Sequence, residues 1–160
     1  MPDIAIVPAR DEHKDAIMAT LESANMHHIP SKEMPSLDLS HAFVALMDGV
    51  VVGFSGIKML APVDGVGRAK TTLLAVLPEF RKHGIGRMLQ ERRMLAAIDL
   101  GAQVLITNAD RPETIGWYKK HFGYREVGHV KKDHEFGLAD VHEWTTLETD
   151  LLTWRASHDG

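Results

Sequence analysis

The sequence contains no cysteine among its 160 residues, which excludes disulfide bonds, thiolate metal sites and cysteine nucleophiles. It also lacks long apolar runs, and its longest apolar stretches are well short of the roughly 20 residues that a membrane-spanning helix needs. The first ten residues show no basic segment followed by an apolar stretch, so no signal peptide is expected. The lack of cysteine does not fix the compartment, but the lack of a signal peptide and of a membrane span predicts a cytoplasmic protein with no membrane partner.

A surplus of basic residues is missing as well. The formal net charge is −4 and the isoelectric point is about 6.2. A protein built mainly to bind nucleic acid would carry a basic surface, so we expect no nucleic-acid partner. The length suits one domain with its own core, and neither a repeat nor a linker divides it. The sequence therefore predicts a single domain over residues 1–160.

Hydrophobic periodicity and turn residues predict an α/β fold that begins with a strand and a helix. Asp48–Gly49 lies between two β-rich runs and is a strong hairpin signal. Hairpins need antiparallel pairing and strand–helix–strand units need parallel pairing, so we expect a mixed, mostly antiparallel sheet with helices on both faces. The expected strands are Ile4–Val7, Ala42–Met47, Val50–Met59, Lys70–Leu77, Val104–Thr107, Arg125–Val130 and His142–Leu152.

Three helices are expected between these strands. The first follows Asp11, whose side chain is placed to cap it, and the second covers Ile85–Leu100. The third begins at Asp110–Glu113, which resembles a capping box, and ends near His121. Two segments rich in proline, glycine or serine, Met26–Ser40 and Leu60–Ala69, are predicted to be loops.

The most informative segment runs from Leu74 to Gly86 and reads LAVLPEFRKHGIG. An expected strand ends at Pro78, a basic loop with two glycines follows, and a helix begins at once. The first N–H groups of a helix lack internal partners and carry the positive end of its dipole, so this arrangement favours a bound anion. The spacing fits neither the nucleoside-triphosphate loop nor the dinucleotide fingerprint. The alternative is a turn that uses glycine for its geometry alone.

Two motifs in this chain resemble those of the GNAT superfamily of N-acetyltransferases. Pro78, Arg81, Gly84, Ile85 and Gly86 match that family's R-x-x-G-x-G pattern, which follows a strand and V-x-P. The segment 115–125, IGWYKKHFGYR, is similar to the family's F-Y-x-x-x-G-F signature, and the order of elements is similar over nearly the whole chain. The resemblance implies one GNAT-like domain of about seven strands, with the sheet splayed in its middle by a bulge.

The resemblance also implies an acyl-CoA-dependent N-acyltransferase, with acetyl-CoA as donor. Backbone amides from Arg81 to Arg87 would hold the CoA pyrophosphate, and Leu74 and Val76 would pair with the pantetheine arm and polarise the thioester carbonyl. Tyr118 corresponds to the tyrosine that often protonates the departing thiolate. The implied cofactor-binding residues are Leu74, Val76, Arg81, Lys82, His83, Gly84, Ile85, Gly86, Arg87, Asn108 and Arg111.

The sequence departs from the family pattern at the expected base. Many members carry a glutamate on the strand before the phosphate loop, whereas this chain has Thr72, which cannot act as a base at neutral pH but could order a water molecule. Arg111 stands where an asparagine is common, with Asn108 one turn earlier. Other candidate bases near the loops are His27, His28, His41, His134, Glu135, His142 and Glu143. Their spacing does not fit a zinc site, so no metal is predicted.

Several readings remain open at this point. The donor could carry a longer acyl group, or the domain could be a CoA-binding sensor without catalysis, or a scaffold. We favour a small-molecule amine as acceptor, because no extended charged surface for a polypeptide is evident. The acceptor pocket is expected along Met26–Ser40, Leu60–Ala69 and Lys132–Val141. The apolar segment Trp144–Trp154 fits either a homodimer interface or an ordinary final strand.

Overall fold

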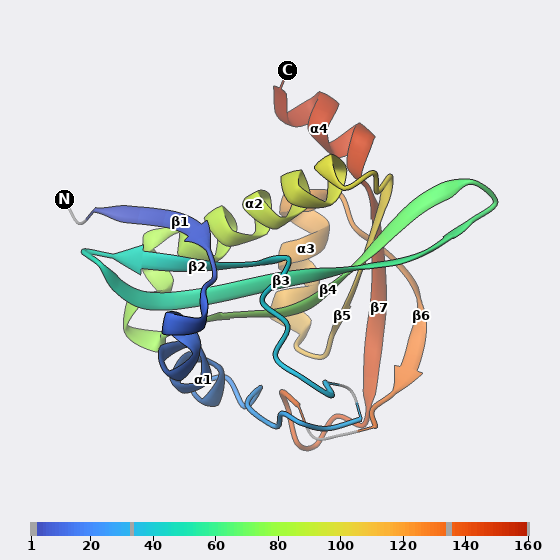
Figure 1. The fold of residues 1–160 in the computed structure, drawn as a ribbon. Coiled ribbons are helices and arrows are strands. Elements are labelled where there is room, and N and C mark those ends of the chain that lie inside the picture. The colour runs from blue at the N-terminus through green and yellow to red at the C-terminus, as the bar shows by residue number, and fades with distance from the viewer. Residues whose placement is uncertain (1–2, 33, 134–135, 160) are drawn as a thin grey trace.

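A mixed sheet runs through the centre of the molecule in the computed structural model, which describes residues 3–32, 34–133 and 136–159 (Figure 1). Within these residues the sheet has seven strands in the order β1-β2-β3-β4-β5-β7-β6. Every neighbouring pair is antiparallel except β4 and β5. The strands are β1 Ile4–Pro8, β2 Ala42–Met47, β3 Val50–Val63, β4 Val66–Val76, β5 Val104–Ala109, β6 Arg125–Lys131 and β7 Glu143–Asp150. The predicted fold class is confirmed.

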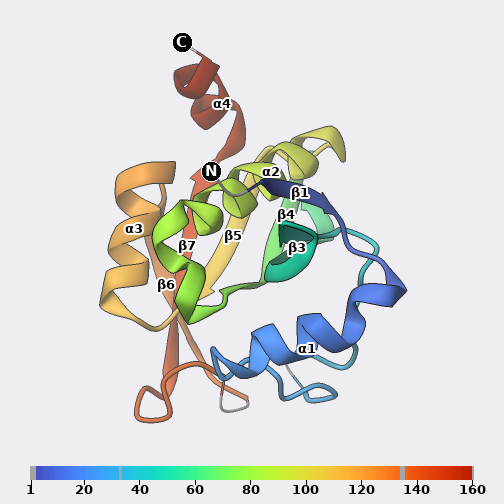
Figure 2. The same ribbon diagram turned by 90° about the vertical axis from the view of Figure 1, so that its left-hand side faces the viewer.

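Helices cover both faces of the sheet, as Figure 2 shows for α1 on one side and α2 and α3 on the other. Alternation along β2 explains the two faces, because Val44 packs with Ile17 of α1 whereas its neighbour Phe43 packs with Leu89 of α2. The helices are α1 Lys14–Glu22, α2 Ile85–Asp99, α3 Pro112–Phe122 and α4 Leu151–Asp159, with short 3-10 helices at Asp11–His13 and Pro78–His83.

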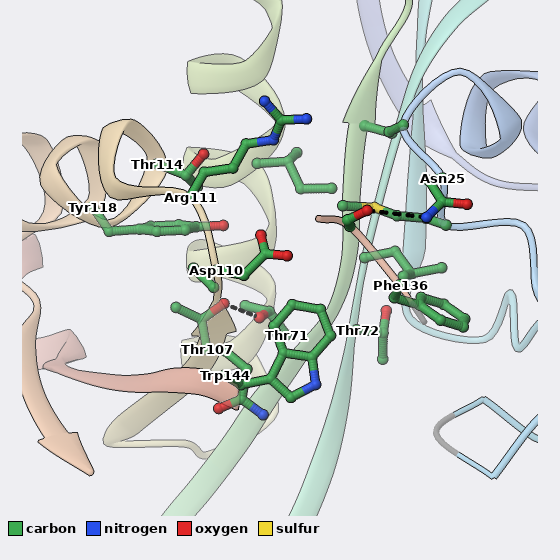
Figure 3. Close-up of a pocket in the computed structure, with 18 of the residues that line it drawn as sticks. Asn25, Thr71, Thr72, Thr107, Asp110, Arg111, Thr114, Tyr118, Phe136 and Trp144 are labelled. Atoms are coloured by element: carbon green, nitrogen blue, oxygen red, sulfur yellow. Dashed lines mark hydrogen bonds between the residues drawn. The ribbon is translucent and has the colours of Figure 1, made fainter. Parts of the chain in front are cut away.

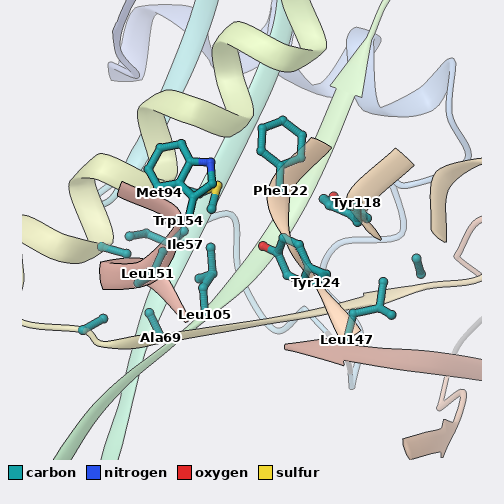
Figure 4. Close-up of a cluster of buried hydrophobic side chains, with 13 residues drawn as sticks. Ile57, Ala69, Met94, Leu105, Tyr118, Phe122, Tyr124, Leu147, Leu151 and Trp154 are labelled. Carbon is teal, nitrogen blue, oxygen red and sulfur yellow. The ribbon is translucent and has the colours of Figure 1, made fainter. Parts of the chain in front are cut away.

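The largest buried cluster lies where α2, α3 and α4 meet the sheet (Figure 4). It joins Met94 of α2, Phe122 of α3 and Trp154 of α4 with strand residues such as Leu105 and Leu147. The apolar side chains of the C-terminal segment are therefore used largely inside this chain. A homodimer through that segment stays a prediction.

The β3–β4 hairpin is longer than predicted, and the expected loop at Leu60–Ala69 is wrong. Both strands continue to a tight turn at Asp64–Gly65, where both residues have positive φ. Asp-Gly is the same hairpin signal that was recognised at Asp48–Gly49. Pro62 suggested a loop, but it lies beyond the part of β3 that pairs with β2, where a missing N–H donor is tolerated.

The C-terminal strand is also shorter than predicted. β7 ends at Asp150, and residues predicted as strand up to Leu152 belong instead to α4. The Asp150 carboxylate accepts a hydrogen bond from the Thr153 N–H at 2.9 Å, which is a helix-capping contact. This local signal was present in the sequence but was missed beside the apolar pattern.

Neither predicted aspartate cap is present. Asp11 lies in the 3-10 turn before α1, and the residue at the helix N-cap is His13, with no side-chain capping bond. At α3 the N-cap residue is Arg111, again without a side-chain bond. Asp110 is bound instead to Lys132 and to the Leu138 N–H, so a tertiary ion pair has replaced the local cap.

Candidate active site

The sheet opens between β4 and β5. The two strands pair only from Arg68 to Lys70 with Val104 to Ile106, and then diverge. On the other side of β4 the register with β3 shifts between Ser55 and Ile57, where β4 has an extra residue. Such a bulge bends its strand, which here turns β4 away from β5. The predicted splay is confirmed, and the side chains of Thr71 and Thr107 are hydrogen-bonded where it begins (Figure 3).

A cavity of about 860 Å³ occupies this opening, and we refer to it as the β4–β5 cavity. Its walls come from β4, from the end of β5, from α3, and from the loops after α1 and β6. Of the predicted CoA-binding residues, it is lined by Leu74, Val76, Arg81, Gly86, Asn108 and Arg111. The others, Lys82, His83, Gly84, Ile85 and Arg87, do not line it.

One end of the cavity meets the start of α2. Gly84 adopts a left-handed conformation with φ of 74°, and the Met88 N–H donates to its carbonyl. The three amides before Met88 therefore have no carbonyl within the helix to bind. A Cβ built at Gly86 comes no closer than 3.9 Å to other atoms, so the backbone is open toward the cavity. This geometry suits an anion, while direct contact between residues 81–87 and CoA stays a prediction.

The basic side chains of the loop have partners of their own. Arg81 donates from Nε to the Val76 carbonyl at 3.1 Å, which fastens the loop to the end of β4. Arg87 forms an ion pair with Glu91 one turn along α2, also at 3.1 Å. The first turn of α2 contains no acidic residue, so its positive end is not neutralised locally.

Tyr118 lies on α3 in the wall of the cavity, with its hydroxyl directed into the space (Figure 3). The ring is 4% exposed and packs at 5.0 Å against Tyr124. Its hydroxyl oxygen accepts a hydrogen bond from Arg93 Nη2 at 2.9 Å. The neighbouring Trp117 packs against the main cluster and also lines the cavity.

Arg93 and Gln90 were missed by the sequence reasoning, although both are buried beside Tyr118. Arg93 Nε donates to Gln90 Oε1 at 2.6 Å, and Gln90 Nε2 donates to the Tyr124 hydroxyl at 3.0 Å. Burial, followed by the nearby Tyr118, raises the pKa of the Tyr124 phenol, so that phenol is neutral at physiological pH. An arginine and a glutamine in an amphipathic helix usually face solvent, so only the tertiary structure shows this network.

Away from the start of α2, the cavity is lined by Phe136 and Gly137 of a loop that we call the Gly137 loop, residues 136–138. Asn25 Nδ2 donates to the Gly137 carbonyl at 3.0 Å, and the Gly137 N–H donates to the Asn25 carbonyl at 3.1 Å. On its other side, Asp110 and Lys132 bind the backbone of the same loop. The loop therefore bridges the end of α1 and the end of β5.

This end corresponds in part to the predicted acceptor pocket. Met26 and Met34 from the first predicted segment line the cavity, as do Phe136 and Gly137 from the third. No residue of Leu60–Ala69 lines it, because that segment forms the far end of the β3–β4 hairpin. Trp144 lines the cavity too, with Lys132 Nζ 4.4 Å from its ring centroid.

The candidate bases are distributed unevenly around the site. Thr72 lines the cavity, whereas no histidine does among the residues described. Of the candidate histidines, His28 forms a hydrogen bond through Nε2 with Asn25 Oδ1 at 2.8 Å. Asn108, which was predicted to bind CoA, accepts a hydrogen bond at Oδ1 from the Thr146 hydroxyl at 2.7 Å. His134 and Glu135 lie outside the described residues. Across the described part of the chain, no three His, Asp or Glu side chains are grouped closely enough to hold a metal ion.

One known protein family matches most of this chain. A family model described as the acetyltransferase (GNAT) family matches residues 10–124, which contain both motifs and the splayed strands. The chain belongs to the GNAT family. A search of curated proteins gave no match for this GNAT chain.

Solved structures agree on the fold. The N-acetylglutamate synthase of Neisseria gonorrhoeae, complexed with coenzyme A and N-acetyl-glutamate, superposes with a TM-score of 0.71 at 18% identity over 93% of this chain. The GNAT chain spans only 35% of that longer protein. The ribosomal-protein-S18-alanine N-acetyltransferase of Escherichia coli gives 0.71 at 18% identity, covering 93% of this chain and 94% of its own. A Salmonella typhimurium protein with its cofactor acetyl-CoA gives 0.68 at 18% identity, with coverage of 93% and 94%.

None of the helices in the described parts of this GNAT chain combines the length and apolar character needed to cross a membrane.

Proposed function

We propose that this GNAT protein transfers an acetyl group from acetyl-CoA to a primary amine of a small molecule, by direct attack with both substrates bound. The observation that carries the proposal is the β4–β5 cavity, which joins the open start of α2 at one end to an apolar, loop-covered end at the other. Tyr118 lies in the wall of this cavity, with its hydroxyl facing the space. One continuous space thus has room for donor and acceptor together.

The donor half fits CoA chemistry. The backbone of Gly86 is open toward the cavity, and the first amides of α2 are suited to the pyrophosphate. The peptide groups of Leu74 and Val76 border the cavity on the bulged strand, where they can pair with the pantetheine arm. The thioester supplies an activated acyl group, and the chain's own residues position it.

Tyr118 is the residue we assign as general acid. Its hydroxyl faces the cavity, so it can give a proton to the sulfur as the carbon–sulfur bond breaks. An alkylammonium acceptor with a pKa near 10.4 is only about one part in two thousand neutral at pH 7. Among the residues described no histidine lines the cavity, and the Asp110 carboxylate that lines it is paired with Lys132. We therefore propose that the amine loses its proton to water ordered by Thr72.

The acceptor half favours a small amine with an apolar body. Phe136, Trp144, Met26 and Met34 contribute apolar surface there. The Gly137 loop bridges both sides of this end, which disfavours an extended polypeptide running through it. The N. gonorrhoeae relative was solved with a small amino-acid product, whereas the E. coli relative is named for a protein substrate, so the fold does not decide this point.

A screen of amines with acetyl-CoA, read by release of free thiol and by product mass, tests the proposal. We expect turnover with at least one small apolar amine, and little with peptides that carry a free N-terminus. Turnover with peptides alone would contradict the acceptor class. Binding of acetyl-CoA without turnover of any amine would instead favour the second candidate, a CoA-binding sensor, for which the specific observation is Thr72 in place of a carboxylate on β4.

A further inference from the structure

Arg93 is a buried cation whose partners are all neutral among the described residues. Arg93 is 1% exposed, and no carboxylate within residues 3–32, 34–133 or 136–159 pairs with it. Its four acceptors are Gln90 Oε1 at 2.6 Å, the Tyr118 hydroxyl at 2.9 Å, and the carbonyls of Leu73 at 3.0 Å and Gly56 at 3.5 Å. Burying a charge is costly unless an opposite charge compensates it, so a guanidinium held by dipoles alone calls for an explanation beyond packing.

The guanidinium connects the bulge to the candidate general acid. The carbonyls of Leu73 and Gly56 belong to the place where β3 and β4 lose register. Tyr118 reaches the same guanidinium from α3, on the far side of the opening between β4 and β5. Because a guanidinium is planar with a rigid set of donors, these bonds fix the Tyr118 oxygen relative to the bulged strand.

The same contact fixes the direction of the Tyr118 proton. A guanidinium has only donors, so the phenol oxygen must accept from Arg93 and its own O–H is not used in that bond. No acceptor for this O–H is found within the described residues, and the hydroxyl faces the cavity. The proton is therefore available to a group bound in the cavity.

We propose that Arg93 is a positioning residue for acyl transfer, which rests on the function proposed above. As the amine nitrogen forms its bond to the acyl carbon, the carbon–sulfur bond breaks and its electron pair goes to sulfur. Tyr118 gives its O–H proton to that sulfur, and the Arg93 charge stabilises the phenolate that remains. The proton lost by the amine returns to Tyr118 through water, so the products are the amide and the free thiol.

A double-mutant cycle tests this assignment. We expect Arg93→Met to lower kcat about 10- to 100-fold in the wild-type background while changing the Kd for CoA by less than about threefold. In a Tyr118→Phe background the same change should have almost no further effect on kcat, because Arg93 acts through Tyr118. Arg92→Met is the matched control: Arg92 is the preceding residue of α2, stacks on Phe43 at 4.4 Å and does not line the cavity, so kcat should persist.

A spectroscopic measurement is independent of turnover. The chain has only two tyrosines, so ¹³C labelling of the phenol carbon bearing oxygen gives two signals, which Tyr124→Phe assigns. We expect Arg93→Met to shift the Tyr118 signal and Arg92→Met to leave it in place. If Arg93→Met does not fold, Arg93→Lys keeps the charge but not the planar donor set, and the same shift is expected.

The outcomes separate the two proposals. An unmoved Tyr118 signal, or equal losses of kcat from Arg93→Met with and without the Tyr118 hydroxyl, would overturn the role of Arg93 while leaving the proposed function intact. Absence of turnover by the wild-type protein with every amine would overturn the proposed function, and the catalytic part of the Arg93 proposal with it. Loss of kcat only when the Tyr118 hydroxyl is present, together with the shifted signal, supports the role.

Discussion

Asp110 and Lys132 form an ion pair of 2.8 Å between side chains that are 8% and 6% exposed. Lys132 also donates to the carbonyls of Phe136 and Leu138, and the Leu138 N–H donates to Asp110. The pair therefore holds the Gly137 loop at one end of the β4–β5 cavity. Asp110 stands where the sequence predicted a helix cap, but its carboxylate binds Lys132 and Leu138, which are distant in the sequence.

Removing one partner of this pair should destabilise the protein. Lys132→Met leaves the Asp110 carboxylate buried without its cation, and such losses commonly cost about 3–5 kcal/mol. We expect the free energy of unfolding, measured by urea denaturation, to fall by that order. The double variant Asp110→Asn with Lys132→Met should recover part of the loss. An effect of Lys132→Met below about 1 kcal/mol would show that the pair does not hold the loop.

Gly137 provides a narrower test of the same loop. Its φ is 71°, and a Cβ there would clash with an Asp110 carboxylate oxygen, so Gly137→Ala should displace the loop from Asp110. We expect a raised KM for the amine with an unchanged Kd for acetyl-CoA, since the loop lies at the opposite end of the cavity from α2. Gly128→Ala, in β6 with open space around it, is the matched control. An unchanged KM in Gly137→Ala would remove the loop from the acceptor site.

Tyr118→Phe separates chemistry from binding. The variant keeps the ring and its packing on Tyr124 but loses the hydroxyl, so kcat should fall about 10²-fold or more with CoA affinity preserved. Steady-state kinetics and calorimetric titration measure the two quantities. Equal kcat values for the variant and the wild type would mean that another group protonates the sulfur.

The raised pKa of Tyr124 predicts that the protein loses stability at alkaline pH. Burial raises the pKa of its phenol above the unfolded value of about 10, so the unfolded chain loses the proton first as pH rises. The stabilisation from the neutral phenol is complete below about pH 10 and is lost above it. We expect the unfolding free energy of the wild type to fall more steeply than that of Tyr124→Phe between about pH 9 and 11. Parallel curves for the two proteins would contradict this account.

Tyr124→Phe should also lower stability at neutral pH, because Gln90 Nε2 would lose its buried acceptor. A loss of about 1–3 kcal/mol is expected for an unsatisfied buried donor. Urea denaturation at pH 7 measures this loss. An unfolding free energy equal to that of the wild type would show that Gln90 finds another partner.

The fold was largely predictable because its signals are local. Runs of β-favouring residues marked the strands, and Asp48–Gly49 marked a hairpin whose turn the structure places there. The errors arose where one local sequence pattern is compatible with two different structures. Pro62 resembles a loop residue but lies in a long hairpin, and Asp110 resembles a cap but binds Lys132, 22 residues away.

The candidate site was predictable only in part, for a physical reason. The glycines of the phosphate loop and Tyr118 belong to motifs that are contiguous in sequence. The Arg93 network joins α2, α3 and the β3–β4 bulge, so each of its members looks ordinary in its own helix or strand. The acceptor end combines residues from the loops after α1 and β6, where the sequence carries no periodic signal.

Calorimetric titration with acetyl-CoA tests the central claim most directly, because the account depends on an open backbone at the start of α2. We predict saturable binding by the wild type and by Gly116→Val, a matched exposed helix glycine outside the cavity, with no detectable binding by Gly86→Val. At a hundred times the Kd, bound ligand should add about 2.7 kcal/mol to stability, seen as a raised Tm. Absence of binding by the wild type at millimolar acetyl-CoA, or equal binding by Gly86→Val, would contradict the account.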